Sequence, residues 1–575
     1  MTFTFTVTAV DWGRVAPELI MAVMTLVVML VDLLLPRSGA SAKDSGPTNF
    51  VVLPLLCLLG IAGAFAATIV LFVAGDQQAA FNNMIGSDYG SLYAYIIILS
   101  ASALGIMLSP SYLKRLNLVH QGEYYALYLL ATLGMLLMSA ALNFLVIFLG
   151  LEMLSLALYI LCGFVTRRVG SQEAGMKYFL LSSFASAILL YGIALTYGST
   201  GSTTFTNIRG FLSIRSPQII LQGHGILQAF PTHTLLLVAM GLMVVGFAFK
   251  VSAIPFQAWT PDVYDGAPAP VTAFMSVGTK AAAIIAFARV FDIVLGPVIS
   301  DWQPIVWAIA VLTIVGGNIM ALVQTNTKRL LAYSSIAHAG YLLIGVVVGG
   351  TVGIAAILFY LLCYTFMNLG AFGVVSILEH VDNSGSNYSD IRGLWYRQPI
   401  LAGTLAIFLL ALAGFPPMSG FAAKYYIFYA ALQGGHPELL IIGVLASVLG
   451  MYYYLRVIAT MFMEKEPVAT ALTTATKPQT GNLTSGKRNS TKLSQDTMIA
   501  PAKGGVAVAV KPKTTAAVQP KTTVPTATVQ SSNGNWFTWI ALGAALVGTF
   551  AMGTVLPFWL VQLAQQAAGM MTLLK

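Results

Sequence analysis

Charged side chains are scarce in this chain. Only 9% of the 575 residues are Asp, Glu, Lys or Arg, whereas 57% are hydrophobic and the mean hydropathy is +0.82. An ordinary soluble domain carries about 25% charged residues. The shortage of charge therefore argues against a soluble protein and indicates a polytopic membrane protein.

Motifs for redox and nucleotide chemistry are missing as well. The three cysteines, Cys57, Cys162 and Cys363, lie far apart in apolar segments and form no CxxC spacing. This argues against iron–sulfur clusters and structural zinc. The six histidines do not pair along any one apolar run, as bis-histidine haem ligation would require, and there is no GxGxxG or Walker A motif. We expect no cofactor or metal in this chain and no nucleic-acid partner.

Long apolar runs are what the sequence does contain. Taking windows of about 20 apolar residues as spans, we predict an all-α fold with about fourteen transmembrane helices. Their approximate limits are 17–36, 50–74, 91–109, 124–141, 143–166, 174–198, 233–254, 271–294, 303–324, 328–349, 352–380, 399–433 (interrupted), 438–462 and 536–563. No basic segment and no small-residue cleavage site precede the first run, so we expect it to be retained as a span.

Basic residues indicate which loops face the cytoplasm. The loops after spans 1, 3, 5, 9 and 11 hold Arg37, Lys43, Lys114, Arg115, Arg167, Arg168, Lys328, Arg329, Arg392 and Arg397. The intervening loops hold only Arg209 and Arg215. Because short cytoplasmic loops retain Lys and Arg, we expect the odd-numbered loops inside and both termini outside.

Residues 464–535 differ in composition from everything around them. This low-complexity run of Thr, Ala, Pro, Lys and Ser has nine basic and three acidic residues, so it carries six of the chain's nine net positive charges. We expect a disordered cytoplasmic linker between spans 13 and 14. Attraction to anionic lipid or to an acidic neighbouring subunit is the alternative.

A few ionisable residues fall at or near membrane depth. The basic ones are Lys177, Lys250, Lys280, Arg289 and Lys424, and the acidic one well inside a span is Glu152. A charge at the bilayer centre costs about 2.5 to 3.5 kcal/mol, so such residues normally face a protein interior or water and mark an ion path. We therefore predict that the titratable members of this set carry protons.

Each of these residues also has a structural interpretation. Glu152 could be a neutral, hydrogen-bonded acid that joins two helices, and the lysines at 250, 280 and 424 could snorkel to an interface. Lys177 is next to Glu173 in helical spacing, so a surface ion pair is as plausible as a functional role. Arg289 does not titrate, and we expect it to anchor a span end or to pair with a neighbour.

Two proline breaks suggest an internal repeat. Pro255 follows Lys250 in span 7, and Pro416 and Pro417 precede Lys424 in span 12, five spans later. An odd offset inverts the second unit relative to the first, as in transporters whose broken helices carry the ion site. His338 on span 10 then corresponds to Glu152 on span 5. A lone histidine on a helix is more often a core residue, so its role as a proton relay is one of two hypotheses.

The repeat gives the domain boundaries. We expect an N-terminal three-helix segment, a first repeat of spans 4–8, a second inverted repeat of spans 9–13, a linker and a last transmembrane helix. Their limits are 1–123, 124–294, 295–463, 464–535 and 536–575.

Four contiguous runs resemble subunit N of the bacterial NADH-quinone oxidoreductase, respiratory complex I. They are EAGMKYFLLSSFASAILLYG, GFAFKVSAIPFQAWTPDVYDGAPAPV, TNTKRLLAYSSIAHAGYLL and AGFPPMSGFAAKYYIF. The similarity covers residues 15 to 463 and the last span. The insert 464–535 departs from the family pattern, which leaves open only the geometry between spans 13 and 14.

The resemblance implies an antiporter-like subunit of a proton-translocating enzyme, without a redox centre of its own. It implies that Glu152, Lys250, Lys280 and Lys424 line the proton channel. NADH, FMN, iron–sulfur clusters and quinone would belong to other parts of the complex. The implied partners are the antiporter-like subunit M, small subunits such as K and J, and the lipid of the bacterial plasma (inner) membrane.

Two other hypotheses remain open at this point. A stand-alone Mrp-type cation/proton antiporter would use the same charges without electron transfer. A scaffold subunit would pack against its neighbours and move no ions.

Overall fold

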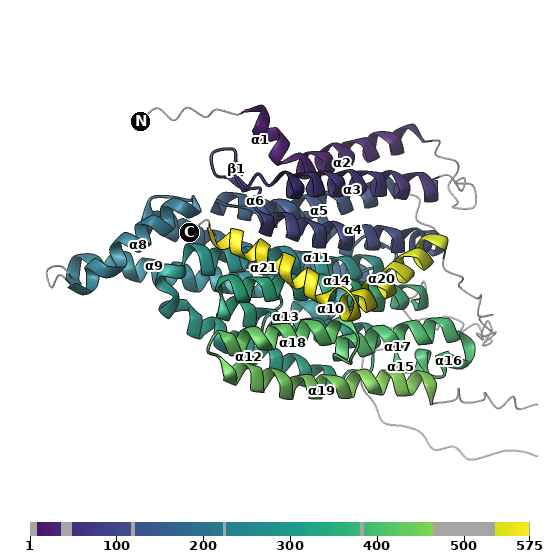
Figure 1. The fold of residues 1–575 in the computed structure, drawn as a ribbon. Coiled ribbons are helices and arrows are strands. Elements are labelled where there is room, and N and C mark those ends of the chain that lie inside the picture. The colour runs from purple at the N-terminus through teal and green to yellow at the C-terminus, as the bar shows by residue number, and fades with distance from the viewer. Residues whose placement is uncertain are drawn as a thin grey trace, which may run out of the picture. The chain divides into compact units, whose positions relative to one another are not determined.

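The apolar runs fold as helices in a computed structural model that describes residues 8–35, 49–116, 121–221, 226–379, 385–463 and 535–573 (Figure 1). A helix satisfies its own backbone N–H and C=O groups, which a bilayer cannot do. The predicted linker 464–535 lies outside the described residues except for Asn535, the N-cap residue of the helix that follows it.

The elements of the first half alternate long helices with short connections. They are α1 (Ala9–Arg14), α2 (Ala16–Leu34), α3 (Asn49–Ala74), β1 (Ala79–Ala80), β2 (Ile85–Gly86), α4 (Tyr89–Arg115), α5 (Gln121–Ala140), α6 (Phe144–Cys162), α7 (Val169–Thr200), α8 (Phe205–Leu221), α9 (Ile226–Lys250), α10 (Trp259–Gly266), α11 (Ala269–Ala288) and the π-helical turn η1 (Arg289–Val294). The two strands form one short antiparallel pair.

The second half of the chain also alternates long helices with short connections. Its elements are the 3₁₀ turn η2 (Gly296–Val298), α12 (Ile299–Leu322), α13 (Thr327–Val348), α14 (Gly350–Leu378), α15 (Tyr388–Ile391), α16 (Leu394–Arg397), α17 (Pro399–Ala413), α18 (Ser419–Gln433), α19 (Pro437–Phe462), α20 (Trp536–Thr554) and α21 (Pro557–Leu573).

The predicted fold class is confirmed. Among the described residues, twelve helices are long and apolar enough to cross a membrane, and two shorter apolar helices lie at Thr234–Lys250 and Pro399–Ala413. Each predicted span overlaps one of these helices. The count of fourteen spans and the inverted repeat stay predictions.

The predicted last span, 536–563, is wrong at its C-terminal end. The helix that begins at Trp536 ends at Thr554, and a separate helix begins at Pro557. Proline suits the first turn of a helix, where its missing N–H would have no partner, so Pro557 starts a new helix. Both helices pack against α4 and α14, which brings the end of the chain beside much earlier segments (Figure 1).

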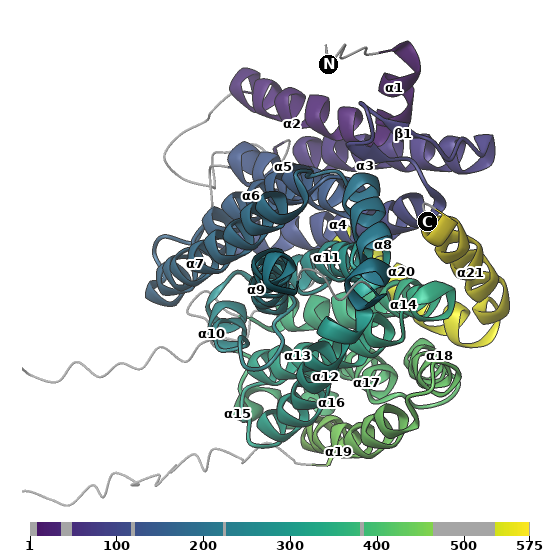
Figure 2. The ribbon, with the colours of Figure 1, turned by 90° about the vertical axis from the view of Figure 1, so that its left-hand side faces the viewer.

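The centre of the bundle is α11, in which every residue is buried. It contacts α4, α5, α6, α9, α13 and α14, and Figure 2 shows it among these helices. Because α11 touches no lipid-facing surface, polar side chains on it are solvated by neighbouring helices alone.

In two pairs of helices, a glycine allows the two backbones to lie close together. A Cβ atom added to Gly134 would lie 2.6 Å from the backbone nitrogen of Leu154, so α5 and α6 are in near-backbone contact. A Cβ atom added to Gly340 would lie 2.7 Å from the backbone nitrogen of Ile314, which shows the same approach between α12 and α13. Small residues allow such close packing in membrane helices. The two pairs occupy equivalent places in the predicted repeats.

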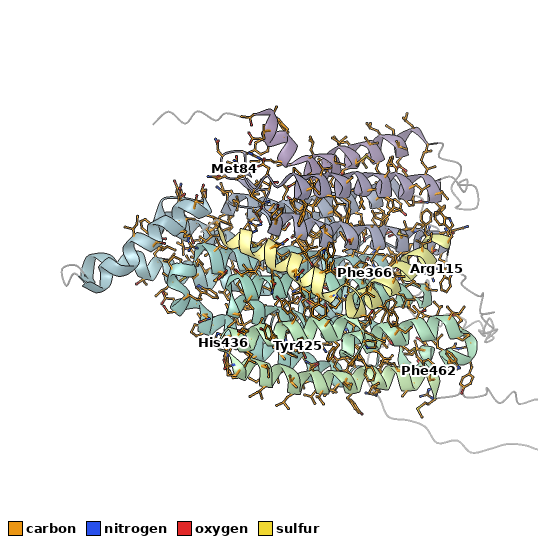
Figure 3. The ribbon with its side chains drawn as sticks, viewed as in Figure 1. Met84, Arg115, Phe366, Tyr425, His436 and Phe462 are labelled. Carbon is orange, nitrogen blue, oxygen red and sulfur yellow. The ribbon has the colours of Figure 1, made fainter. Side chains whose placement is uncertain are left out.

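The bundle has two distinct ends. In Figure 3, Arg115 and Phe462 lie near one end, and Met84 and His436 near the other. The end that carries Arg115, Arg168 and Lys328 is called the basic end below. The opposite end carries the start of α4 and the end of α11, where Asp88 pairs with Arg289 at 2.8 Å.

Candidate functional site

Lys250 is the last residue of α9 and points into the bundle. Only 2% of the residue is exposed. Its Nζ atom donates hydrogen bonds to Ser155 Oγ at 2.6 Å and to Tyr178 Oη at 3.3 Å. A helix C-terminus is partly negative, which stabilises a cation there. Two hydroxyl groups thus hold the ammonium group of a lysine that ends its helix.

Glu152 lies on α6, one helical turn before Ser155. Residues three apart share a helix face, so Lys250 contacts the face that bears the carboxyl group. Glu152 is half-buried, and its buried Oε1 has no hydrogen-bond partner within the described residues. Among the residues that the structure describes, no ion pair joins Glu152 to Lys250. The ammonium group of Lys250 is thus bonded to Ser155, one helical turn from Glu152, and not to the Glu152 carboxyl group.

The break after Lys250 contains Pro255 and separates α9 from α10. Ser252 has a positive φ of 65°, and its hydroxyl accepts a hydrogen bond of 2.7 Å from Thr260. The backbone N–H of Ile254 donates to Thr313 Oγ1 on α12 at 3.0 Å. The backbone N–H of Ile254 is thus bonded within the protein, as the bilayer requires.

Lys280 lies midway along α11 and is 1% exposed. Its Nζ atom donates to the backbone oxygen of Ser335 at 2.5 Å and also to the Ser335 hydroxyl. One turn earlier on α11, Ser276 accepts a separate hydrogen bond of 2.6 Å from Asn368 on α14. The lysine is therefore solvated by α13, with further amide and hydroxyl groups nearby.

A polar row follows one side of α13. Ser335, His338 and Tyr341 are three residues apart, which places them on one face of the helix. His338 Nδ1 lies 2.7 Å from Tyr360 Oη, and its Nε2 lies 3.3 Å from Tyr454 Oη. This row begins at Lys280 and ends at the ring of Tyr341.

Lys424 closes the row at the second helix break. Its Nζ atom lies 5.4 Å from the centre of the Tyr341 ring and donates to Ser447 Oγ at 2.8 Å. It also donates at 3.0 Å to the backbone oxygen of Ala413, the last residue of α17. Lys250 thus ends the half-helix that precedes the first break, and Lys424, which lies on α18, places its ammonium group at the end of the half-helix that precedes the second.

The second break, between α17 and α18, contains Pro416 and Pro417. Gly414 starts it with a φ of 90°, a conformation that favours glycine. A Cβ atom at this position would lie 3.0 Å from Lys424 Cδ. The glycine therefore permits both the turn and the approach of the lysine side chain.

The candidate residues form two groups. Glu152 and Lys250 make up the first, and Lys280, His338 and Lys424 make up the second. No hydrogen bond among the described residues connects Lys250 to Lys280. The aromatic and sulfur contacts between them include Tyr178 stacked on Trp259 and Cys162 Sγ at 3.6 Å from Met275.

Lys177 belongs to neither group. Its side chain is 41% exposed and forms ion pairs with Glu173 at 2.7 Å and with Asp262 at 2.9 Å. Asp262, on α10, also accepts from Arg329 at 3.0 Å. Burial raises the pKa of the Asp262 carboxyl group, but the hydrogen bonds from the two cations outweigh it and hold the pKa below its usual value. Lys177 is a partner in a surface network near the basic end.

Hydroxyl partners of the lysines were not predicted from the sequence. Each of the three buried lysines donates to one serine side chain: Lys250 to Ser155, Lys280 to Ser335 and Lys424 to Ser447. Serines are common in membrane helices, so residue type alone gives no signal. The spacing of three from Glu152 to Ser155 is the one hint that the sequence offers.

Other buried charges were also missed. Lys328 was placed in a loop, but it is 0% exposed near the start of α13, because Glu379 and two backbone carbonyls surround its ammonium group. Glu18, in the first turn of α2, is buried too and accepts a hydrogen bond from Tyr95, a contact that was not predicted from the sequence. Arg289 pairs with Asp88, as expected of a non-titrating anchor.

The side chains described here do not fit a metal or an iron–sulfur cluster. The three cysteines are free and buried in different helices. Within the described residues, no three His, Cys, Asp or Glu side chains are placed to hold a metal ion.

Comparison with known proteins decides the family. Residues 141–450 match the family described as NADH:quinone oxidoreductase/Mrp antiporter, TM. A relative from Trichlorobacter lovleyi named NADH-quinone oxidoreductase subunit N is 42% identical over 455 residues, which cover 79% of this chain and 88% of the relative. The chain belongs to the NADH-quinone oxidoreductase subunit N family. This confirms the family that the four sequence runs resemble.

Solved structures agree with membership of the subunit N family. A chain of respiratory complex I from Thermus thermophilus with bound aureothin is 28% identical, with a TM-score of 0.66 over 95% of this chain and 98% of that one. A chain of the Mrp complex from Dietzia sp. has a TM-score of 0.72 over 97% of both chains at 19% identity, which shows a shared fold. The predicted function, a proton-translocating membrane subunit of NADH-quinone oxidoreductase, is supported by these findings together.

Proposed function

We propose that the two groups of candidate residues are the proton path of this subunit. In this proposal Glu152 and Lys250 form the first half of the path, and Lys280, His338 and Lys424 form the second. Quinone reduction takes place in other subunits, and the protons move here in response to it.

One contrast carries the proposal. Buried cations that only stabilise a fold are normally paired with an acid, because an unpaired buried charge is costly. Arg289 pairs with Asp88, and both Arg168 and Lys328 pair with Glu379. Lys250, Lys280 and Lys424 are at most 7% exposed, yet within the described residues their ammonium groups contact hydroxyl and carbonyl oxygens and no carboxylate. Among the described residues, these three buried lysines therefore lack a carboxylate contact that would stabilise the charged form of the amine.

Hydroxyl partners suit a group that gains and loses a proton. A serine hydroxyl accepts from an ammonium group and can rotate to donate to a neutral amine. A carboxylate only accepts, so it would favour the charged form. Ser155, Ser335 and Ser447 thus stabilise each lysine in both protonation states. A nearby acid such as Glu152 would favour the charged state of Lys250 when it approaches, which couples proton uptake to conformation.

We propose the membrane orientation from the loop charges. The basic end would face the cytoplasm of a bacterial inner membrane, with both termini outside and the 464–535 linker inside. A cysteine at Lys114, which is exposed at the end of α4, should react with a membrane-impermeant thiol reagent added from the cytoplasmic side. A cysteine at Glu438, at the start of α19, should react from the outside. Labelling with the sides exchanged would overturn the orientation.

The partners follow from the structures in which relatives are found. The similar chains belong to respiratory complex I and to the Mrp complex, which are assemblies of several subunits. We expect this chain to assemble with the other membrane-arm subunits, such as M, K and J, and with membrane lipid. Purification as a lone homo-oligomer would favour the stand-alone antiporter instead.

The function is tested by the change Lys250→Ala in the assembled complex. The NADH:quinone reductase rate, the amount of assembled complex and the number of protons moved per NADH in proteoliposomes are measured together. We expect assembly with fewer protons per NADH. Lys114→Ala, at an exposed lysine on α4, is the matched control. Unchanged proton transport in Lys250→Ala would leave only the scaffold hypothesis.

A further inference from the structure

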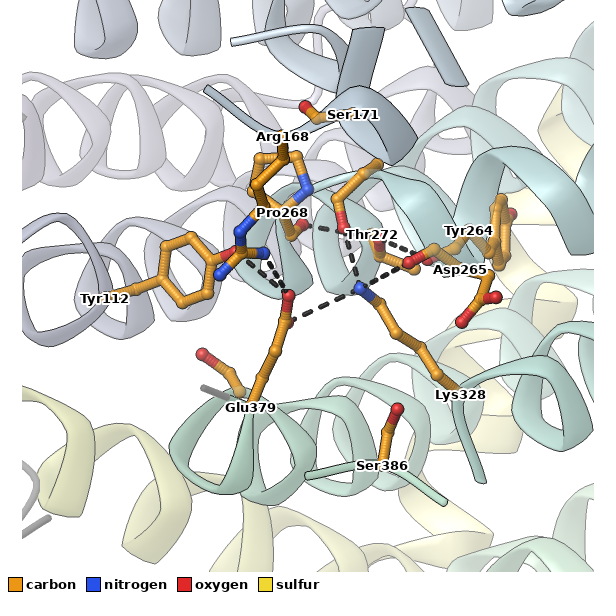
Figure 4. Close-up of polar contacts among 12 residues, drawn as sticks. Tyr112, Arg168, Ser171, Tyr264, Asp265, Pro268, Thr272, Lys328, Glu379 and Ser386 are labelled. Carbon is orange, nitrogen blue, oxygen red and sulfur yellow. Dashed lines mark hydrogen bonds and ion pairs between the residues drawn. The ribbon is translucent and has the colours of Figure 1, made fainter. Parts of the chain in front are cut away.

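A buried ion-pair cluster lies at the basic end, outside both groups of the proposed path (Figure 4). Glu379, the C-cap residue of α14, is its centre. Glu379 Oε1 accepts from Arg168 at 2.6 Å and from Tyr112 at 3.1 Å, and Oε2 lies 3.4 Å from Lys328 Nζ. The side chains of Glu379 and Lys328 are 0% exposed, and that of Arg168 is 9% exposed. One carboxylate is shared by two buried cations.

The two cations come from different parts of the chain. Arg168 is the N-cap residue of α7, directly after the helix that bears Glu152. Lys328 is the second residue of α13, the helix that bears Ser335 and His338. Glu379 therefore connects the elements that hold the first group of the path to those that hold the second.

Lys328 also fixes the helix that follows the first break. Its Nζ atom donates to the backbone oxygens of Asp265 at 2.9 Å and Ala267 at 2.8 Å. These oxygens belong to the C-terminal end of α10, where a cation is favourable. The position of α10 thus depends on the side chain that also contacts Glu379.

The position of α10 in turn sets the surroundings of Lys250. Trp259, the first residue of α10, stacks on Tyr178 with ring centres 4.7 Å apart, and its Nε1 donates to the backbone oxygen of Phe249 at 3.1 Å. Tyr178 is one of the two hydroxyl partners of Lys250. A shift of α10 would therefore move a direct partner of the ammonium group.

We propose that Glu379 is a positioning residue which couples the surroundings of Lys250 to the second half of the path by holding Arg168 and Lys328 at once. The coupling acts through Lys328 and α10 to Trp259 and Tyr178. Glu379 Oε1 lies 2.6 Å from Arg168 Nη1, whereas Glu379 Oε2 lies 3.4 Å from Lys328 Nζ, which is 0.8 Å longer. The Lys328 contact is therefore the weaker of the two. This inference rests on the proposed function, because it assigns a partner to the same site.

The variant Glu379→Asp tests the coupling while keeping the charge. Its side chain is shorter by one methylene group, so it cannot reach both cations from the same backbone position. We expect normal assembly and quinone reductase activity, with at least a twofold decrease in protons moved per NADH. Glu438→Asp, at a partly exposed acid on α19, makes the same chemical change at the opposite end and is the control. A purely structural role would change assembly and leave the proton ratio unchanged.

Two further variants separate the possible outcomes. Glu379→Gln leaves two buried cations without their acid and should lower the proton ratio further if the complex assembles. If it does not assemble, Glu379→Asp alone decides. Lys328→Arg keeps a cation between α10 and Glu379, and we expect it to retain more than half of the normal proton ratio.

Lys250→Ala is measured beside these variants. If Lys250→Ala lowers the proton ratio and Glu379→Asp does not, the coupling is wrong and the proposed function stands. If neither variant changes the ratio, the proposed function itself is wrong.

Discussion

The hydroxyl oxygen of Ser155 lies 2.6 Å from Nζ of Lys250, and the same kind of contact recurs at the two other buried lysines of the proposed path. The arrangement separates these lysines from the cations that pair with acids. It suggests that the chain solvates them with groups that tolerate both protonation states.

The change Ser155→Ala should weaken the first half of the path. It leaves Lys250 with the longer contact to Tyr178 at 3.3 Å. A hydrogen bond to a charged group contributes about 1.5 to 3 kcal/mol, so we expect a severalfold slower proton transport with normal assembly. The measurement is the initial rate of proton uptake by proteoliposomes at matched NADH oxidation. The control is Ser183→Ala, which removes only a hydrogen bond to the backbone oxygen of Leu180 on an exposed part of α7. Equal rates in the two variants would contradict a role for the serine.

The change His338→Gln tests whether the histidine is a relay or a core residue. Glutamine is of similar size and can keep one hydrogen bond to Tyr360 or Tyr454, but it does not titrate. We expect an assembled complex with a lower number of protons per NADH. A normal ratio would show that His338 has a packing role only.

Gly414 offers a test of the second break. Alanine at a positive φ costs about 1 to 2 kcal/mol, and here its Cβ would also lie 3.0 Å from Lys424 Cδ. Gly435 has a φ of 78°, and a Cβ atom added to it would meet nothing within 4 Å, so it provides the same backbone strain without the contact. We expect Gly414→Ala and Gly435→Ala to lower the unfolding temperature similarly, and only Gly414→Ala to reduce proton transport. Equal transport would mean that the position of Lys424 is not critical.

The ion pair of Asp88 and Arg289 should behave as a structural element. Asp88 also accepts from the backbone N–H of Ser91 at 3.0 Å and so caps α4, a contact that Asn can retain. Breaking a buried pair on one side costs about 3 to 5 kcal/mol. We expect Asp88→Asn and Arg289→Met each to lower the unfolding temperature of the complex, and the double variant to be less destabilised than the sum of the two. Strict additivity would argue against an energetic coupling between the two side chains.

The burial of the three lysines of the proposed path was predictable because their neighbours in sequence are apolar. Lys250 lies in GFAFKVSAI and Lys280 follows VGT at the centre of an apolar run, so burial was evident without any contact. Lys328 lies in TNTKR, which is typical of a loop. Its burial depends on Glu379 and on the backbone of Asp265, which are 51 and 63 residues away. Contacts over such separations arise from packing and leave no local signal.

The partners of the lysines were not predictable for the same reason. Ser335 and Ser447 are 55 and 23 residues from the lysines that they contact. The sequence shows that Glu152 and Lys250 both fall at membrane depth, but not which side chain contacts the lysine. The packing of α6 against its neighbours places Ser155 at the ammonium group.

Proton transfer through Lys250 is best tested by the number of protons moved per NADH by a complex that carries Lys250→Arg. Arginine keeps the positive charge and can still donate to Ser155, but it does not release its proton in a protein. With assembly and electron transfer at their normal levels, we expect a lower proton count than in the unmodified complex. A normal proton count would contradict the claim that the Lys250 amine carries protons.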